Sequence, residues 1–428
     1  MKIIFNKIWQ EATKIIPGGN MLYSKRAEMF LPGAWPAYFV KSKDCYLWDK
    51  NKKKYVDMIF AVGTNVLGYS NKSVNKAVKK AIDAGVMTTL NSYEEVLLAK
   101  KLLKLNQWAD MVKFARSGGE ANAISIRIAR AYSNKKQNVA MCGYHGWHDW
   151  YLSSNLKNNS NLNSYLSKNV KIAGVNRKLK NTTFLFKYND LVELERLLNK
   201  KKIGIIKMEV ERSIKPKKNF LQNVRKLANK YKAVLIFDEC TSGFRQTLGG
   251  IYKDYRVTPD IITYGKALGN GYAITAIVGK KKFMQACQDT FISSTFWSER
   301  VGFAAALETI KLMEKKKTHK IIKKTGKYIK LYWKKLSKKN NINIIVSGID
   351  SIPQFSFEKE NQKNKTFLTQ EMLKKGYLAS NIVYVSTVHT RKILNKYFLE
   401  LDLIFKRISL NKNTLDGKIA HTEFKRLN

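Results

Sequence analysis

The sequence is poor in cysteine, proline and acidic residues, and each shortage excludes a class of protein. Its 428 residues include only 4 cysteines, widely separated, so neither a disulfide scaffold nor a CxxC metal site is expected. With 6 prolines and 44% hydrophobic residues, the composition is that of a globular protein rather than a disordered or collagen-like chain. The apolar runs are strand-sized, far below the ~20 residues that span a bilayer. Residues 1–10 lack the pattern of a secretory signal, so we expect a cytoplasmic protein. His145 and His148 have no third ligand at metal-site spacing, so we expect no metal.

The scarcity of acidic residues leaves a large excess of positive charge. Lys and Arg number 79 against 32 Asp and Glu, which gives a formal net charge of +47. One interpretation is binding to nucleic acid or an anionic membrane through counterion release. The lysines are, however, spread through nearly every segment, without a basic motif interleaved with aromatics. We therefore interpret the charge as solvated surface, and expect neither a specific nucleic-acid partner nor a membrane partner.

Between about residues 112 and 278, short apolar runs alternate with amphipathic stretches. The runs predict strands at residues 139–142, 203–209, 234–237, 261–264 and 274–278. Apolar residues at helical spacing predict helices at residues 121–131 and 221–232. Strand, helix and strand in alternation predict an α/β fold, in which a mostly parallel sheet is flanked by helices on both faces.

Outside this region the patterns change. The first 55 residues contain turn signals and a probable hairpin, whereas Lys-rich helical patterns after residue 300 surround an alternating apolar segment. We therefore expect an N-terminal arm and hairpin at 1–55, a large α/β domain at 56–300 and a small α+β domain at 301–428.

Three ionisable side chains stand at or just beyond predicted strand ends, namely Glu209, Asp238 and Lys266. Ligands of such sheets bind beyond the carboxyl ends of the strands. An amine and a carboxylate in this place suit pyridoxal 5′-phosphate (PLP), which needs an amine for its Schiff base and a carboxylate to keep its ring nitrogen protonated. Taken alone, the lysine would be a solvated side chain and the aspartate a strand-end cap. Their ordered combination predicts Lys266 as the Schiff-base lysine and Asp238 as the partner of the ring nitrogen.

Residues 234–245 and 259–271 resemble the signature of class III, or ω-type, PLP-dependent aminotransferases. The resemblance extends over nearly the whole chain. It implies the PLP-dependent transferase fold of type I, with a seven-stranded type of sheet and a smaller C-terminal domain.

A second resemblance lies at Ser117, Gly118 and Gly119, just before a predicted helix. Glycines that open a helix expose backbone N–H groups and the positive end of the helix dipole, which together suit a phosphate. Such a pair of glycines is more often only a turn and cap. The family uses this element to hold the cofactor phosphate.

The remaining cofactor contacts are implied by the resemblance. Tyr144 and His145 match the Tyr-His-Gly segment of the family, whose aromatic residue stacks on the pyridine ring. Glu209 and Thr241 fall where relatives keep groups near the cofactor. Thr295 matches a threonine that contacts the phosphate of the neighbouring subunit, which implies a homodimer with shared sites.

The chain is most similar to the glutamate-1-semialdehyde 2,1-aminomutase group, from which it departs around the substrate. Ser24 and Arg26 stand near the place of an arginine that binds the substrate carboxylate. We expect an aminotransferase that moves an amino group between an amine donor and a carbonyl acceptor through pyridoxamine phosphate. The alternatives are the aminomutase itself and, from a different class, a non-catalytic PLP-fold binding protein.

Overall fold

The computed structural model describes residues 7–424, which form two compact units. The first, here called the sheet unit, comprises Lys72–Leu166 and Val170–Lys320. The second, here called the terminal unit, takes the described residues of Met1–Asn71, Ser167–Asn169 and Ile321–Asn428. The unit boundaries thus group the two ends of the chain together. Domains at 1–55, 56–300 and 301–428 stay a prediction.

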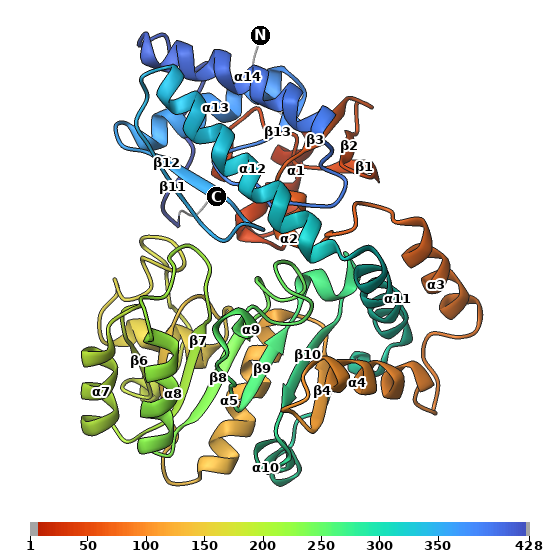
Figure 1. Ribbon diagram of the computed structural model, residues 1–428, viewed down its shortest axis with the longest axis vertical. Helices are drawn as coiled ribbons and strands as arrows, with labels where there is room; N and C mark the ends of the chain where they lie inside the picture. The colour runs from red at the N-terminus through yellow and green to blue at the C-terminus, as the bar shows by residue number, and fades with distance from the viewer. Residues whose placement is uncertain (1–6, 425–428) are drawn as a thin grey trace. The chain divides into compact units, whose positions relative to one another are not determined.

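The sheet unit is built on seven strands in the order β4-β10-β9-β8-β7-β5-β6 (Figure 1). The pairs from β9 to β6 are parallel, and β10 is antiparallel to both of its neighbours. All five strands predicted from apolar runs are present, so the expected mostly parallel sheet is confirmed. The strands are β4 (Met111–Ala115), β5 (Asn138–Cys142), β6 (Thr183–Leu185), β7 (Ile203–Glu209), β8 (Val234–Glu239), β9 (Ile261–Tyr264) and β10 (Thr275–Gly279).

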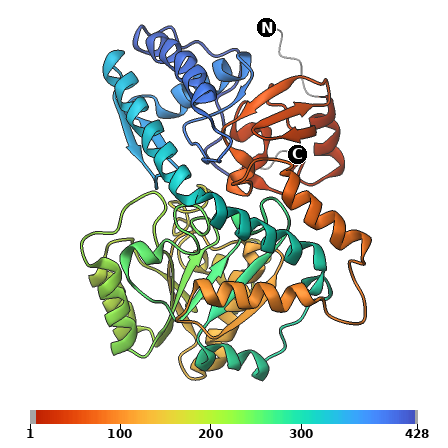
Figure 2. The ribbon, with the colours of Figure 1, turned by 45° about the vertical axis from the view of Figure 1, so that its right-hand side comes forward.

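Helices cover the sheet on both sides, as Figures 1 and 2 show. The predicted helices are α5 (Gly118–Ser133) and α8 (Phe220–Lys230), and α7 (Leu191–Lys200) packs beside α8. The other helices of this unit are α3 (Lys72–Asp83), α4 (Tyr93–Leu105), α6 (Asp149–Leu152), α9 (Tyr252–Tyr255), α10 (Lys281–Met284) and α11 (Arg300–Lys316). The long helix α12 (Thr318–Lys339) begins in the sheet unit and continues in the terminal unit.

The face of the sheet covered by α5 is apolar because alternate strand residues are branched hydrophobics. Ile205 and Ile236 belong to one buried cluster with Ile124 and Ile128 of α5. Side chains alternate between the two faces of a strand. Lys207, two residues beyond Ile205, therefore points toward α5 as well, into an otherwise apolar layer.

The terminal unit contains a four-stranded sheet and a two-stranded sheet. The first has the order β1-β2-β3-β13, with β1 (Phe39–Lys43), β2 (Tyr46–Asp49), β3 (Lys54–Asp57) and β13 (Tyr377–Leu378). The second pairs β11 (Ile344–Ser347) with β12 (Gln354–Phe357). Helices α1 (Lys7–Ile15), α2 (Phe60–Gly63), α13 (Asn361–Lys374) and α14 (Arg391–Ser409) complete the unit. The predicted hairpin is present as β1 and β2.

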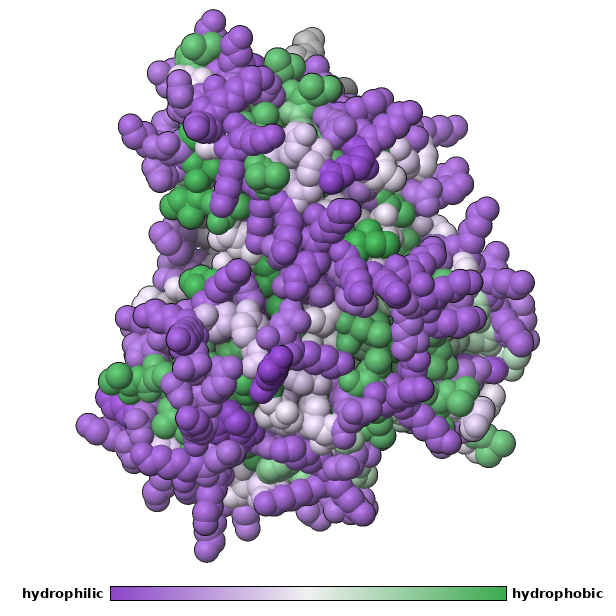
Figure 3. Space-filling model, in the orientation of Figure 1, coloured by the Kyte–Doolittle hydropathy of each residue, from purple (hydrophilic) through white to green (hydrophobic). Residues whose placement is uncertain are grey.

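Hydrophilic side chains occupy most of the face drawn in Figure 3, with smaller apolar patches between them. Within residues 7–424, no helix is both long enough and apolar enough to cross a membrane.

Candidate active site

The register of the parallel strands brings the predicted residues to one edge of the sheet. Glu209, the last residue of β7, lies beside Asp238 of β8. Asp238 in turn lies beside Thr263 of β9. Lys266 opens the short 3-10 helix η5 (Lys266–Gly269), just after β9. The carboxyl ends of three adjacent strands therefore carry the three ionisable residues singled out in the sequence.

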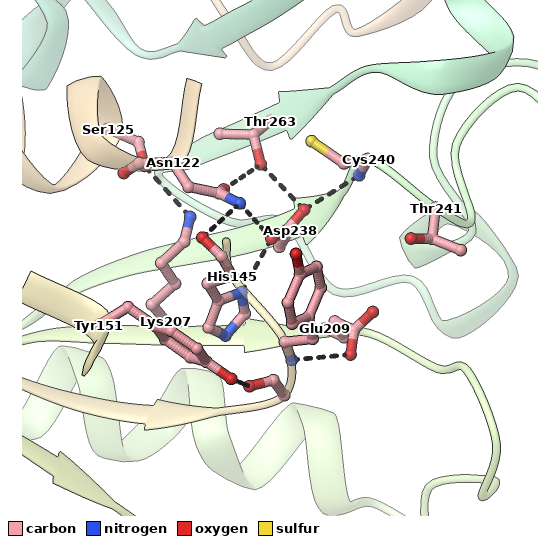
Figure 4. A network of polar contacts seen from close by, with 12 residues as sticks. Asn122, Ser125, His145, Tyr151, Lys207, Glu209, Asp238, Cys240, Thr241 and Thr263 are labelled. Atoms are coloured by element: carbon pink, nitrogen blue, oxygen red, sulfur yellow. Dashed lines mark hydrogen bonds and ion pairs between the residues drawn. The ribbon is translucent and has the colours of Figure 1, made fainter. Parts of the chain in front are cut away.

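Asp238 is the centre of a buried hydrogen-bond network (Figure 4). Its Oδ2 accepts from Asn122 Nδ2 at 2.7 Å and contacts His145 Nδ1 at 2.8 Å. Its Oδ1 accepts from the backbone N–H of Cys240 at 3.0 Å and from Thr263 Oγ1 at 3.3 Å. With the residue only 3% exposed, these bonds fix the carboxylate in one orientation.

The network keeps Asp238 ionised. Burial alone raises the pKa of a carboxyl, but the hydrogen bond from His145 and the positive charge of Lys207 hold the pKa of Asp238 well below its usual range. The second ring nitrogen of His145 lies 3.2 Å from the carbonyl oxygen of Cys142. The two ring nitrogens of His145 thus connect Asp238 to the end of β5.

Lys266 combines a strained backbone with a hydrogen-bonded amine. Its φ of 43° lies in the left-handed region that non-glycine residues rarely adopt. Its Nζ donates to Thr241 Oγ1 at 2.8 Å. Burial, helped by the positive charge of Arg212, lowers the pKa of Lys266 to about 8. The neutral, nucleophilic amine is therefore far more abundant near neutral pH than in an exposed lysine.

Glu209 is held against the turn that follows β5. Its Oε2 accepts from the backbone N–H of Tyr144 at 3.1 Å, and its Oε1 lies 3.5 Å from Arg212 Nη1. Gly143, with φ of 118°, makes this approach possible, because a Cβ there would stand 2.9 Å from Oε2. The Tyr144 ring lies edge-on to the Tyr151 ring, with centroids 6.1 Å apart.

The first turn of α5 has the features of an anion seat. Ser117 caps the helix by accepting from the N–H of Glu120, whose carboxylate accepts from the N–H of Ser117 at 2.7 Å. The next amides, those of Gly118 and Gly119, have no preceding helical turn to bond with. Gly146 packs directly on Gly119, since a Cβ on Gly146 would stand 3.0 Å from the Gly119 Cα.

The segment that contains Phe296 and Trp297 is hydrogen-bonded beside this turn. The guanidinium of Arg116 donates to the carbonyl oxygens of Phe296 at 2.6 Å and Trp297 at 3.1 Å. Trp297 Nε1 donates to Glu120 Oε1 at 3.1 Å. Thr295, which begins the 3-10 helix η7 (Thr295–Ser298), is exposed at the edge of this arrangement.

Ser24 and Arg26 belong to the terminal unit. Ser24 is half-buried in the 3-10 helix η1 (Tyr23–Lys25). The Arg26 guanidinium lies over the rings of Tyr23 and Phe424, 5.1 and 5.6 Å from their centroids. Gly18 makes room for it, because a Cβ there would stand 2.1 Å from the guanidinium. Their contact with a substrate stays a prediction.

The residues of the sheet unit fit PLP. An ionised, buried carboxylate suits a protonated ring nitrogen, and an amine of lowered pKa suits the bond to the cofactor. A ring N–H needs a free lone pair on Asp238, and the Thr263 hydroxyl can release one. Its single proton is within reach of Asn122 Oδ1 at 3.1 Å as well as Asp238 Oδ1 at 3.3 Å. When the hydroxyl turns to Asn122, a lone pair of Asp238 becomes available to a ring N–H.

Sequence reasoning missed four residues of this site, namely Asn122, Lys207, Arg212 and Thr263. Lys207 had a visible signal, because it interrupts the apolar run of β7. Asn122 shares a helix with apolar neighbours, and its role depends on contacts that no local pattern shows. Within the described residues, no three His, Cys, Asp or Glu side chains gather to hold a metal ion. The absence of a metal stays a prediction.

Comparison with known proteins places these features in a family context. The family model described as aminotransferase class-III matches residues 32–395. The chain is 34% identical to 3-aminobutyryl-CoA aminotransferase of Cloacimonas acidaminovorans (strain Evry) over 366 residues, 82% of this chain and 83% of that protein. It is 31% identical to glutamate-1-semialdehyde 2,1-aminomutase of Methanocaldococcus jannaschii over 425 residues, 94% and 97% of the two chains.

The fold is also similar to that of solved structures of PLP-binding proteins. The PLP internal aldimine form of the FumI protein of Sphingopyxis sp. MTA144 superposes with a TM-score of 0.87 at 22% identity, covering 96% of this chain and 98% of that one. The expected PLP-dependent transferase fold of type I is thereby confirmed.

Proposed function

Because the chain belongs to the class III aminotransferase family, we propose that it is a PLP-dependent aminotransferase acting on an amine donor and a carbonyl acceptor. The family itself is PLP-dependent. The observation that carries the proposal is that the Lys266 amine and the ionised Asp238 stand at the ends of adjacent strands, β9 and β8.

Each residue has a definite task in this proposal. PLP, when bound, supplies a protonated ring that accepts electrons from the substrate. Asp238 holds the proton on the ring nitrogen, and Asn122 and His145 fix the carboxylate that does so. Gly118 and Gly119 present amides to the phosphate, with Ser117 as the helix cap. Tyr144, beside Glu209, covers the ring.

Lys266 has two tasks. Its neutral amine would bond to the cofactor, and the amine set free when a substrate binds would take the proton from the substrate Cα. Thr241 orients Nζ through the 2.8 Å hydrogen bond, which supports its expected place near the cofactor. The lowered pKa, about 8, makes this nitrogen an effective base near neutral pH.

The test is to trap the cofactor on its lysine. Purified protein mixed with PLP is expected to develop a visible absorption band, and borohydride reduction followed by peptide mapping is expected to find the label on Lys266. Lys207 is the matched internal control, because burial lowers its pKa to about 8 as well. A label on Lys207, or a band that survives Lys266→Ala, would refute the proposal, as would the absence of a band.

A second candidate function is the intramolecular amine transfer of an aminomutase. The 31% identity to the M. jannaschii enzyme over 94% of this chain favours it. Kinetics separate the two, since an aminotransferase requires a second substrate and gives ping-pong kinetics, whereas a mutase turns over glutamate 1-semialdehyde alone. A non-catalytic binding protein is the third possibility, and protein that binds PLP but converts neither substrate class would support it.

We further propose that Ser24 and Arg26 bind the substrate carboxylate, and that Arg212 is the rival cation for this task. Arg212 is supported by its position beside Glu209, 3.5 Å from Oε1. Arg26→Gln and Arg212→Gln discriminate between them. The variant that raises KM for donors with a carboxylate, but not for simple amines, identifies the arginine that recognises the acid.

We also propose a homodimer in which a second copy covers the segments around Thr295. Large apolar side chains are exposed on these segments, among them Leu90 (82%), Tyr93 (67%) and Phe296 (66%). Arg300 connects the segment around Leu90 with the segment around Phe296. Its guanidinium pairs with Glu94 at 2.7 Å, and its backbone N–H donates to the carbonyl oxygen of Val86 at 3.2 Å. A joined set of exposed apolar residues is typical of a protein interface.

A further inference from the structure

Lys207 is a buried lysine that the proposed function leaves without a task. It lies in the middle of β7, is 0% exposed, and points toward α5 (Figure 4). Its Nζ donates to Ser125 Oγ at 3.1 Å. A charged side chain in an apolar layer is costly unless other charges stabilise it. Lys207 therefore needs an electrostatic partner inside the sheet unit.

Two residues of α5, less than one turn apart, connect Lys207 to Asp238. Ser125 Oγ, which accepts from Lys207, itself donates to the backbone carbonyl of Asn122 at 2.8 Å. The Asn122 side chain then donates to Asp238 Oδ2 at 2.7 Å. The ammonium and the carboxylate thus belong to one buried polar network, in a medium where charges interact strongly.

Among the residues that the structure describes, Asp238 supplies the negative charge that stabilises Lys207. The negative charge of Asp238 raises the pKa of Lys207, while burial lowers it to about 8. Cys240, also nearby on the chain after β8, stays a neutral thiol, since burial raises its pKa well above the ordinary value. His145 contacts the same carboxylate from the segment that follows β5.

We infer that Lys207 is a positioning residue that sets, through its charge, how strongly Asp238 holds a protonated ring nitrogen. The inference rests on the proposed function, because it assumes that a pyridine ring meets Asp238. A charged Lys207 competes with the ring for the same carboxylate, whereas the neutral amine does not. Binding of a protonated ring is therefore weakened at low pH and strengthened once Lys207 loses its proton.

The probe for this effect is 4-deoxypyridoxine 5′-phosphate, which keeps the ring nitrogen and phosphate but has no aldehyde to react with Lys266. Its dissociation constant is measured by calorimetry at pH 7 and pH 9.5 for the wild type and Lys207→Met. We expect Lys207→Met to bind about tenfold more tightly at pH 7 and no more tightly at pH 9.5. The probe and the other groups titrate alike in both proteins, so their effect cancels when the wild type and Lys207→Met are compared at the same pH.

Two further variants make the test specific. Ser125→Ala removes the hydroxyl that accepts from the Lys207 ammonium, which should lower the pKa of Lys207. The pH at which probe binding strengthens is therefore expected to be lower in this variant than in the wild type. In Asp238→Asn the carboxylate is gone, and the further substitution Lys207→Met is expected to have no pH-dependent effect. Circular dichroism at both pH values checks that each variant is folded.

The outcomes separate the two proposals. If Lys207→Met changes the affinity by the same factor at both pH values, or not at all, Lys207 is only a packing residue and the inference is overturned. In that case a PLP band on Lys266 still supports the proposed function. If the wild type binds neither the probe nor PLP, both proposals are overturned.

Discussion

At the scale of single residues, Asp238 shows how a carboxylate is prepared before any ligand arrives. Its oxygens accept from Asn122, Cys240 and Thr263, and one of them is paired with His145. These donors stabilise the ionised form and fix its direction. A ring nitrogen placed beside it would meet a carboxylate that is already oriented, with only the Thr263 hydroxyl left to turn, which is the basis of electrostatic preorganisation.

The first prediction concerns this charge. Asp238→Asn places an amide NH2 among donors, so we expect the free energy of unfolding to fall by about 1–3 kcal/mol. We expect kcat to fall about 100-fold or more, because the ring nitrogen loses its counter-charge. Steady-state kinetics and urea unfolding measure the two effects.

Asp260→Asn is the matched control. Asp260 is also buried in the sheet unit, where its carboxylate accepts from Arg225 at 2.9 Å and from the N–H of Leu235 at 2.9 Å. Its loss is expected to lower stability without the large loss of kcat. Equal losses of kcat in the two variants would contradict the role of Asp238.

The second prediction concerns Lys207 in protein without cofactor. Its pKa is about 8 in the folded protein, against 10.5 for an ordinary lysine. Between these pH values the unfolded chain binds a proton that the folded chain does not, so stability rises with pH through this window and the penalty is complete below pH 8. A difference of 10.5 − 8 = 2.5 units corresponds to about 3 kcal/mol.

Lys207→Met is therefore expected to be more stable than the wild type at pH 7, by up to about 3 kcal/mol less the lost hydrogen bond to Ser125. The advantage should shrink as pH rises toward 10.5. Guanidinium unfolding at several pH values measures it, and taking the difference between the two proteins cancels the similar titration of Lys266. A variant that is less stable at every pH would contradict this account.

At the scale of elements, neighbouring side chains limit the space around the first turn of α5. A Cβ at Gly119 would stand 3.2 Å from both His148 Cδ2 and Trp147 Nε1, whereas one at Gly118 would stand 3.6 Å from Cys240 Sγ. The first distance is tight and the second is an ordinary contact. The two glycines, adjacent in sequence, thus differ in how much space surrounds them.

The third prediction uses this difference. Gly119→Ala is expected to displace the Trp147 and His148 side chains and to weaken PLP binding about tenfold, since these side chains pack against the helix amides that we propose as the phosphate seat. Gly118→Ala, the matched control, is expected to change the affinity less than about threefold. Titration with PLP measures both. Equal weakening by the two variants would show that side-chain space at Gly119 is not what matters.

At the scale of the whole molecule, the exposed apolar residues Leu90, Tyr93 and Phe296 form the contact that we propose between two copies. They lie on segments joined by the Arg300–Glu94 ion pair. The high net charge of +47 opposes association of copies through long-range repulsion, so a dimer depends on such apolar contact and is favoured by salt.

The fourth prediction follows from this interface. The double variant Leu90→Ser with Phe296→Ser is expected to be monomeric at micromolar concentration, because it removes two exposed apolar side chains from the proposed contact. Sedimentation equilibrium measures the mass. Val192→Ser is the matched control, since Val192 is equally exposed (81%) but lies on α7, away from these segments in the sheet unit. A wild type that sediments as a monomer would refute the proposed homodimer.

The sequence by itself determined the strands, because apolar runs of strand length leave little choice of local structure. It also determined the three strand ends that carry Glu209, Asp238 and Lys266, since parallel strands share a carboxyl edge. These inferences depend only on local patterns and on one general rule of topology.

Only the tertiary structure decided which neighbours these residues have. Asn122, His145 and Thr263 reach Asp238 from a helix, a turn and an adjacent strand, at separations of 116, 93 and 25 residues. Lysine is usually a surface residue, but Lys207 is buried because side chains alternate along β7 and its position faces α5. Charges and hydrogen bonds act over a few ångströms in space, so sequence patterns determined where the site lies, whereas packing determined its electrostatics.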